Sequence, residues 1–203
     1  MRMRKKKWVQ PFIQNEREYL LDNLNSFNID KPIYMEIGMG MGDFICESAL
    51  KNPDIFYIGL EKEDTCVARA IKKAKDLNIN NFKIIYNDAS NIEELIPCNK
   101  LDLIYLHFPD PWPKKRNNKR RLTYPIFLNK YEKILKDKGL IIFKTDNEAL
   151  FNDSLEYFNS SNFELLDINR NYFNELEPMT AYQKKFYDEG KPIYYAKYEI
   201  DKV

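Results

Sequence analysis

Apolar residues along the chain gather in short runs separated by segments with a helical period. Runs at 33–37, 55–60, 82–86, 101–106 and 140–143 read as buried strands. Between them, residues 43–50, 65–77, 92–96 and 125–135 place apolar side chains on one helical face. Strands that alternate with helices indicate a parallel sheet with right-handed crossovers and helices on both faces. We therefore expect an α/β fold.

The last third of the chain extends this sheet. The sequence 145–147 is expected to begin a further helix, and residues 163–168 and 193–200 read as two more strands. Only an irregular polar and aromatic segment separates those two strands, which permits an antiparallel pair. The prediction is a mostly parallel seven-stranded sheet with an antiparallel last strand. At the other end of the chain, residues 15–24 are expected to form a leading helix, and Thr65 is expected to cap the helix that runs to about Leu77.

Three glycines at alternating positions, Gly38, Gly40 and Gly42, stand between the first strand and the predicted helix at 43–50. Glycine tolerates positive φ and has no Cβ, so the backbone can turn sharply there and a ligand can approach closely. A glycine turn between a strand and a helix is typical of a nucleotide-type cofactor site at the start of a doubly wound sheet. The alternative is a tight turn without a ligand.

Carboxylates follow several of the predicted strands. In open α/β sheets, ligands bind outside the carboxyl ends of the strands, which here carry Glu36, Glu61, Asp88 and Asp146. Glu61 is placed to accept both ribose hydroxyls of an adenosine cofactor, and Asp88 lies where the adenine edge is expected. Taken singly, Glu61 and Asp88 could equally be solvated polar strand ends.

Two cofactors suit such a site: a nicotinamide dinucleotide and S-adenosylmethionine. The dinucleotide pattern is G-x-G-x-x-G with a pyrophosphate at the helix N-terminus. Here the spacing is G-x-G-x-G, and Asp43 at that N-terminus would repel a pyrophosphate. Glu36, just before the glycines, suits the cationic amine of a methionine moiety. Charge therefore favours S-adenosylmethionine.

Composition sets the broad class. The chain has 203 residues, a net charge of +1 and 44% apolar residues, which fits one globular domain over 1–203. No apolar run approaches membrane-spanning length, and three widely spaced cysteines indicate neither a disulfide framework nor a metal site. We expect a cytoplasmic protein whose residues 1–14 form a basic, flexible arm. Oligomeric state, monomer or homodimer, is left open.

A proline-rich loop, residues 108–114, follows the fourth strand. Its three prolines lack an N–H and forbid continued pairing or helix, so Asp110 is held in a rigid loop at the edge of the cofactor site. A basic run from Lys114 to Arg121 comes directly after it. Cations beside a fixed acidic and aromatic pocket suit a polyanion that delivers one base. The alternative is a loop packed by Trp112 beside a solvated basic run.

The stretches 36–42, 108–114, 118–121 and 144–146 together resemble the bacterial tRNA (guanine-N7-)-methyltransferase family, over roughly residues 36–183. The resemblance implies a Rossmann-like class I methyltransferase fold and S-adenosylmethionine-dependent methylation of a guanine in the tRNA variable loop, forming N7-methylguanosine. Its cofactor-binding positions fall on Glu36, Gly38, Gly40, Glu61, Asp88 and Asp110. Its substrate-binding positions fall on Lys114, Asp146, Thr180, Ala181, Tyr182 and Gln183, and its RNA-contacting positions on Arg116, Asn117, Asn118, Lys119, Arg120 and Arg121. One departure is Gln183, where the family has glutamate.

Guanine N7 carries an in-plane lone pair and no proton, so its methylation needs no general base. We expect positioning and carboxylate electrostatics to supply catalysis. We expect Asp110 to be the catalytic residue, which orients the guanine or the cofactor by accepting a hydrogen bond and does not act as a base. Asp146 is expected to select guanine over adenine by accepting from its N1–H and N2–H. His107, the only histidine, is interpreted as a strand-end side chain. Rival functions are methylation of another base or a small molecule, dinucleotide-dependent oxidoreduction, and RNA binding without catalysis. The expected partner is tRNA, with no membrane.

Overall fold

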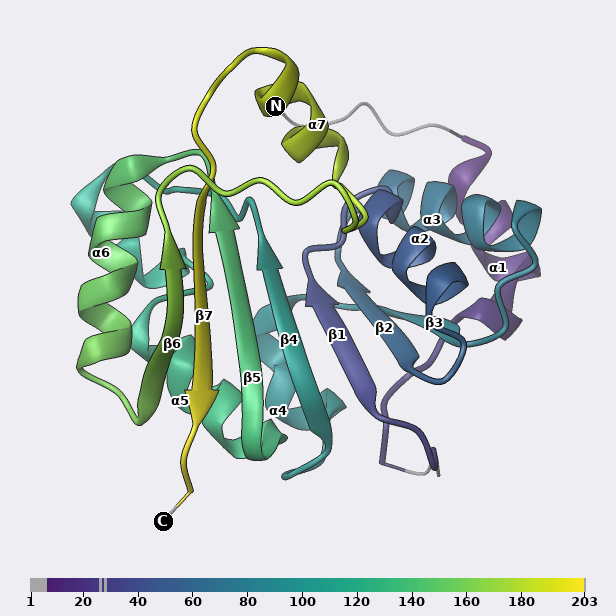
Figure 1. The fold of residues 1–203 in the computed structure, drawn as a ribbon. Coiled ribbons are helices and arrows are strands. Elements are labelled where there is room, and N and C mark those ends of the chain that lie inside the picture. Colours follow the sequence, from purple (N-terminus) through teal and green to yellow (C-terminus); the bar gives the residue numbers. More distant parts are fainter. Residues whose placement is uncertain (1–6, 26, 28, 203) are drawn as a thin grey trace.

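The computed structural model describes residues 7–25, 27 and 29–202. Within them one seven-stranded sheet has the order β3-β2-β1-β4-β5-β7-β6 (Figure 1). The strands are β1 Ile33–Ile37, β2 Phe56–Glu61, β3 Phe82–Tyr86, β4 Leu101–His107, β5 Leu135–Thr145, β6 Phe163–Asn169 and β7 Tyr194–Ile200. Strands β1 to β5 pair in parallel, whereas β7 is antiparallel to both β5 and β6. The predicted sheet, including its antiparallel last strand, is confirmed.

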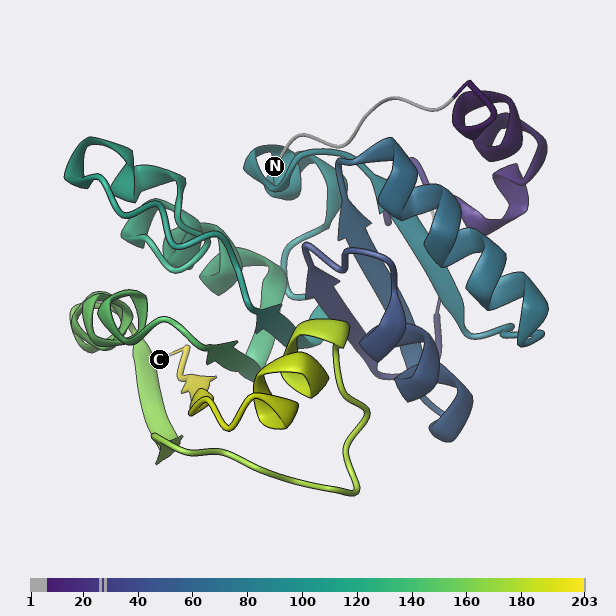
Figure 2. The same ribbon diagram turned by 90° about the horizontal axis from the view of Figure 1, so that it is seen from above.

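Helices cover both faces of the sheet, as Figure 2 shows from above. They are α1 Val9–Asn15, α2 Asp43–Lys51, α3 Asp64–Asp76, α4 Ile92–Leu95, α5 Pro125–Ile134, α6 Glu148–Asn159 and α7 Ala181–Asp188. Short 3-10 helices occupy Arg17–Tyr19, Ala89–Asn91 and Lys115–Arg120. Two apolar clusters result, one that joins the sheet to α1, α2 and α3 and one that joins it to α4, α5 and α6. Burial on both faces explains why the central strands are almost continuously apolar.

The N-terminal segment differs from the sequence prediction. No helix spans 15–24 in the described chain: the helix is Val9–Asn15, and Leu20 instead bridges Ile84 of β3 in an extended conformation. Val9 and Ile13 are buried against the domain, so the expected flexible arm over 1–14 is wrong for this helix. Residues 1–6 of that arm, with most of its basic cluster, lie outside the described residues.

Three further elements differ from the sequence prediction. Helix α3 begins at Asp64 with Glu63 at its N-cap, so Thr65 lies inside the helix and does not cap it. Strand β5 begins at Leu135 and absorbs Lys138, at φ 58°, through an irregularity in its pairing with β4. Helix α7 occupies part of the segment between β6 and β7 that was expected to be irregular. None of the described helices is long and apolar enough to cross a membrane.

Candidate cofactor and substrate site

The glycine turn adopts the backbone that its sequence predicts. Gly38, Gly40 and Gly42 have φ values of 76°, 55° and 73°, which L side chains rarely adopt. A Cβ on Gly42 would lie 2.9 Å from the Cβ of Ala70, so this glycine lets α2 and α3 pack closely. A Cβ on Gly38 or Gly40 would meet no described atom within 4 Å. The first two glycines therefore border open space, as a ligand cradle requires.

The side chain of Glu61, the last residue of β2, bonds to the backbone of the glycine turn. Its Oε2 accepts a hydrogen bond from the Gly40 amide at 3.0 Å, and its Oε1 accepts from the amides of Lys62 and Glu63 at 2.8 and 2.9 Å. Backbone donors thus fix the carboxylate at the end of β2. The amide of Gly40, which would otherwise be free to bind an anion, is already occupied by a carboxylate.

Asp88 stands at the end of β3, the next strand outward. The Ser90 amide donates to its Oδ1 at 2.9 Å, and Lys62 Nζ lies 3.2 Å from its Oδ2. The hydrogen bond from Ser90, followed by the contacts with Lys62, lowers the pKa of Asp88 below its ordinary value. Asp88 is therefore ionised at neutral pH.

Glu36 and His107 form a buried pair at the ends of β1 and β4. Glu36 Oε1 lies 3.1 Å from His107 Nδ1, and both side chains are almost fully enclosed. Burial raises the pKa of Glu36 well above its ordinary range and lowers the pKa of His107 well below its own. Burial therefore favours the uncharged form of each side chain. Within the described residues, Glu36 Oε2 and His107 Nε2 have no hydrogen-bond partner.

Lys144, at the end of β5, makes a second buried contact at the same edge. Its Nζ lies 2.8 Å from Glu177 Oε2 and 4.7 Å from the centre of the Tyr172 ring, and the Tyr172 hydroxyl donates to Glu177 Oε1 at 2.7 Å. Burial lowers the pKa of Lys144, opposed by Glu177. This contact ties the segment between β6 and β7 to the sheet. Sequence reasoning missed it, because no spacing links residues 33 positions apart.

The proline loop after β4 is strained and open. Phe108 and Trp112 have positive φ values, 47° and 41°, in a region that non-glycine residues seldom occupy. Asp110 and Lys114 are exposed. The guanidinium of Arg120 lies 4.9 Å from the centre of the Trp112 ring. The loop thus presents its acid and its cations to solvent at the edge of the sheet.

The basic run after this loop splits by burial. In the 3-10 helix Lys115–Arg120, the cations Arg116, Lys119 and Arg120 are exposed, and Asn117 and Asn118 are half-buried. Arg121 is only 4% exposed and is bonded internally. Its side chain is therefore not on the surface with the other predicted RNA-contacting residues.

Helix α7 brings the predicted substrate segment over the same edge. The hydroxyl of Thr180 accepts from the Gln183 amide at 2.9 Å and so caps the helix. Gln183 is buried, and its Oε1 finds no partner in the described part of the chain, whereas Ala181 and Tyr182 are exposed. The ring of Phe108, from the proline loop, stacks on Tyr182. The spacing of Thr180 and Gln183, typical of a capping box, could have indicated this helix, although the segment was expected to be irregular.

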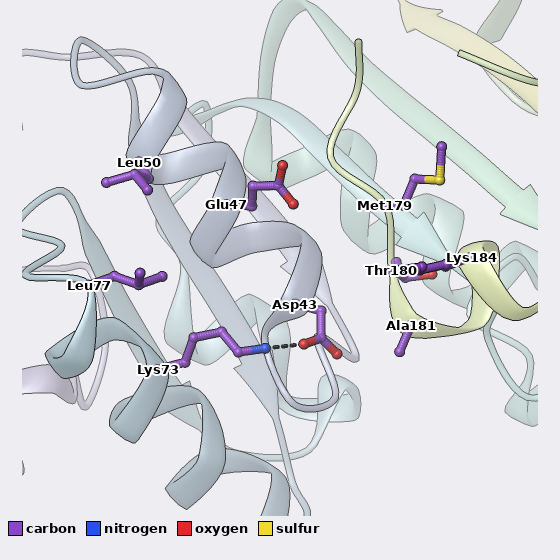
Figure 3. Close-up of a pocket in the computed structure, with 9 residues that line it drawn as sticks. All are labelled: Asp43, Glu47, Leu50, Lys73, Leu77, Met179, Thr180, Ala181 and Lys184. Atoms are coloured by element: carbon purple, nitrogen blue, oxygen red, sulfur yellow. Dashed lines mark hydrogen bonds and ion pairs between the residues drawn. The ribbon is translucent and has the colours of Figure 1, made fainter. Parts of the chain in front are cut away.

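A hollow of about 470 Å³ separates α7 from α2 and α3 (Figure 3). Thr180 and Ala181 line it on one side, and Asp43, ion-paired with Lys73, lines it on the other. Its other lining residues are Glu47, Leu50, Leu77, Met179 and Lys184. Glu61 and Asp88 do not line it. The hollow thus joins the end of the glycine turn to the predicted substrate segment.

The predicted residues meet at one edge of the sheet. Glu36 and Glu61 lie in the last residues of the adjacent strands β1 and β2, and Asp88, Asp110 and Asp146 follow β3, β4 and β5. Figure 1 shows these carboxyl ends at the top of the sheet, below α7. The described residues hold no cluster of histidine, cysteine and acidic side chains that could bind a metal.

The sheet order with its antiparallel β7 and the glycine turn after β1 define a class I methyltransferase fold. Solved structures agree: the chain superposes on the 16S rRNA methyltransferase KamB with a TM-score of 0.63 at 10% identity, covering 100% of this chain and 98% of that one. An rRNA methylase from Streptococcus thermophilus gives a TM-score of 0.55 at 14% identity, covering 98% and 99%. At such identities the likeness concerns the fold alone.

Sequence comparison identifies the family. The model of a family described as "Putative methyltransferase" matches residues 30–196. The tRNA (guanine-N(7)-)-methyltransferase of Staphylococcus aureus is 41% identical over 204 residues, which cover 96% of this chain and 95% of that protein. The enzyme of the same name from Limosilactobacillus reuteri is 39% identical over 206 residues, covering 96% and 97%. The chain belongs to the tRNA (guanine-N7-)-methyltransferase family.

Proposed function

We propose that this protein transfers the methyl group of S-adenosylmethionine to N7 of a guanine in the variable loop of tRNA, forming 7-methylguanosine. Family membership over nearly the full chain supports the reaction and the substrate. The structural observation that carries the proposal is the acidic carboxyl edge of the sheet, with an open glycine turn on one side and an exposed basic 3-10 helix on the other.

The residues at this edge fit S-adenosylmethionine. Gly38 and Gly40 leave the space that the cofactor requires, and the carboxylates of Glu61 and Asp88 suit a positively charged ligand with ribose hydroxyls. Asp43 is paired with Lys73, which weakens its repulsion of a pyrophosphate. The stronger argument against a dinucleotide is Glu61, which occupies the Gly40 amide that a phosphate would use. Glu36, Gly38, Gly40, Glu61, Asp88 and Asp110 would hold the cofactor.

The chemistry requires positioning more than proton transfer. When bound, S-adenosylmethionine supplies an electrophilic methyl carbon on a sulfonium. Guanine N7 has no proton to lose, so the protein needs no general base. His107 is suited to no such role, because it is buried, neutral and bonded to Glu36. Asp110, exposed in the proline loop, is the orienting acceptor, and its negative charge favours the positive charge that develops on the guanine.

Guanine is selected by groups at the end of β5 and on α7. Asp146 is exposed directly after β5, where its carboxylate accepts from N1–H and N2–H of guanine, a donor pair that adenine lacks. Gln183 stands where the family has glutamate, and its amide both donates and accepts. Thr180 and Ala181, which line the hollow, and the exposed Tyr182 beside them complete the substrate segment.

The RNA is held by exposed cations. Lys114, Arg116, Lys119 and Arg120 point from the loop and the 3-10 helix into solvent, and they contact phosphates without reading sequence. Asn117 and Asn118 add polar contacts. Such binding weakens steeply with salt, because each neutralised phosphate releases counterions.

The test is product identification. The purified protein is incubated with methyl-labelled S-adenosylmethionine and unmodified tRNA transcript, and the digested RNA is analysed by nucleoside. We expect label in 7-methylguanosine only. Label in another nucleoside would support methylation of a different base, and tRNA binding without label would support an RNA-binding module. A fluorescence titration with NADH is the control, with no binding expected.

A further inference from the structure

Arg121 is the member of the basic run that turns inward. Its Nε donates to the Pro111 carbonyl at 2.8 Å, and its Nη1 lies 2.5 Å from Asp153 Oδ2 and 3.4 Å from the Tyr157 hydroxyl. The side chain is 5% exposed. A buried guanidinium bonded to a carboxylate is not free to bind a phosphate. Arg121 therefore has a different task from its exposed neighbours.

The proline loop needs donors from outside itself. Pro109, Pro111 and Pro113 have no N–H, so the loop cannot secure its own backbone in the usual way. Phe108 and Trp112 on either side of Asp110 are held at positive φ, which persists only where the surroundings impose it. The Nε of Arg121 bonds the carbonyl of the residue directly after Asp110. Arg121 therefore supplies a hydrogen-bond donor to a stretch of the loop in which alternate residues have no backbone N–H.

Arg121 also connects this loop to the helix α6 that follows the next strand of the site, β5. Asp153 and Tyr157 lie one turn apart on α6, so they share one face of the helix. Helix α6 follows β5 and the predicted guanine-selecting Asp146. One guanidinium thereby joins the loop after β4 to the helix after β5. Only arginine can do this with two separate nitrogens in one fixed plane.

We propose that Arg121 is a positioning residue for the methyl transfer: by holding the Pro111 carbonyl against α6, it fixes Asp110 relative to the substrate side of the site. The inference rests on the proposed function for the reaction that it serves. It assigns Arg121 to the turnover step, not to RNA binding. Small displacements of a positioned group cost large factors in rate, about a hundredfold for 1 Å.

The test compares Arg121→Lys and Asp153→Asn with wild type. We expect both variants to lose about tenfold or more in kcat at saturating tRNA, with the Kd for tRNA and its salt dependence within twofold of wild type. The double variant should lose no more than the worse single variant, since both break one contact. Arg170→Lys, an exposed arginine beside α6 that bonds Asn152, is the matched control and should keep wild-type kcat.

Lys119→Gln shows what the loss of a phosphate contact looks like. We expect this variant to have a higher Kd for tRNA and a salt dependence of binding whose slope is smaller by about one. The proposal is overturned if Arg121→Lys behaves in that way, or if both Arg121→Lys and Asp153→Asn keep kcat within twofold of wild type. Should Arg121→Lys fail to fold, Asp153→Asn and Tyr157→Phe decide the question.

A second readout separates this inference from the proposed function. In a Trp8→Phe background, Trp112 is the sole tryptophan, and acrylamide quenching reports the loop without any reaction. We expect Arg121→Lys to raise the acrylamide quenching constant of Trp112. An unchanged constant would contradict the inference that Arg121 holds the proline loop in place. If wild type forms no 7-methylguanosine, the proposed function fails while this measurement still decides whether Arg121 holds the loop.

Discussion

The three glycines of the turn after β1 allow a sharp prediction, because the structure gives them different reasons to be glycine. Gly38→Ala puts a methyl group into open space at φ 76°, whereas Gly42→Ala puts one 2.9 Å from Ala70 at φ 73°. The backbone strain is therefore nearly the same. Of the two variants, only Gly42→Ala brings its new methyl group into a steric clash with α3.

The magnitudes follow from these two terms. A left-handed alanine costs about 1–2 kcal/mol, partly offset by the lower entropy of the unfolded chain, so Gly38→Ala should lose about 1 kcal/mol of unfolding free energy. Overpacking adds about 1–3 kcal/mol for Gly42→Ala, for a total near 3 kcal/mol. For a chain of this length the falls in Tm should be about 3 °C and about 9 °C.

Ligand binding should show the opposite order. The methyl of Gly38→Ala occupies the space assigned to S-adenosylmethionine, so calorimetric titration should show at least about a tenfold loss of affinity, or ~1.4 kcal/mol. Gly42→Ala, measured well below its Tm, should bind more tightly than Gly38→Ala because its methyl points at α3. Equal stabilities of the two variants would refute the close packing of Gly42 against α3. Wild-type affinity of Gly38→Ala for S-adenosylmethionine would refute the assignment of the glycine turn as its binding site.

Other residues give shorter tests. Lys144→Met strands the half-buried carboxylate of Glu177, so chemical denaturation should show a loss of about 3 kcal/mol, and adding Glu177→Gln should restore most of it. His107 has a lowered pKa, so the unfolded chain binds the extra proton and wild type should lose stability as pH falls below about 6.5. His107→Asn should remove that loss in urea titrations at pH 5.5 and 7.5, and an unchanged pH dependence would show that the histidine is charged in the fold. Asp110→Asn should lower kcat at least about tenfold while the rate stays flat between pH 6 and 8, and near-wild-type turnover would remove Asp110 from the mechanism.

The parts of the molecule that sequence predicts are those fixed by local pattern. Apolar runs located every strand of the sheet, and the glycine turn appeared with the positive φ values that its residues favour. The carboxyl ends then brought Glu36, Glu61 and Asp88 together without any further information. Parallel connectivity is enough to align such ends at one edge.

What sequence did not predict depends on distant partners. Arg121 looked like its surface neighbours, but its internal partners include Asp153, 32 residues later, which no local pattern indicates. Lys144 and Glu177 are joined in the same way. The leading helix was misplaced for a different reason: Pro11 falls in the first turn of α1, where proline is tolerated, so it does not prevent a helix from beginning at Val9.

The central claim is that N7 of guanine accepts the methyl group at this edge of the sheet. The most direct measurement uses a tRNA transcript in which 7-deazaguanosine replaces guanosine, so that a carbon stands where N7 was. The account predicts that this transcript still binds through its phosphates and takes up no methyl label. Label incorporated at the rate seen with ordinary transcript would contradict it.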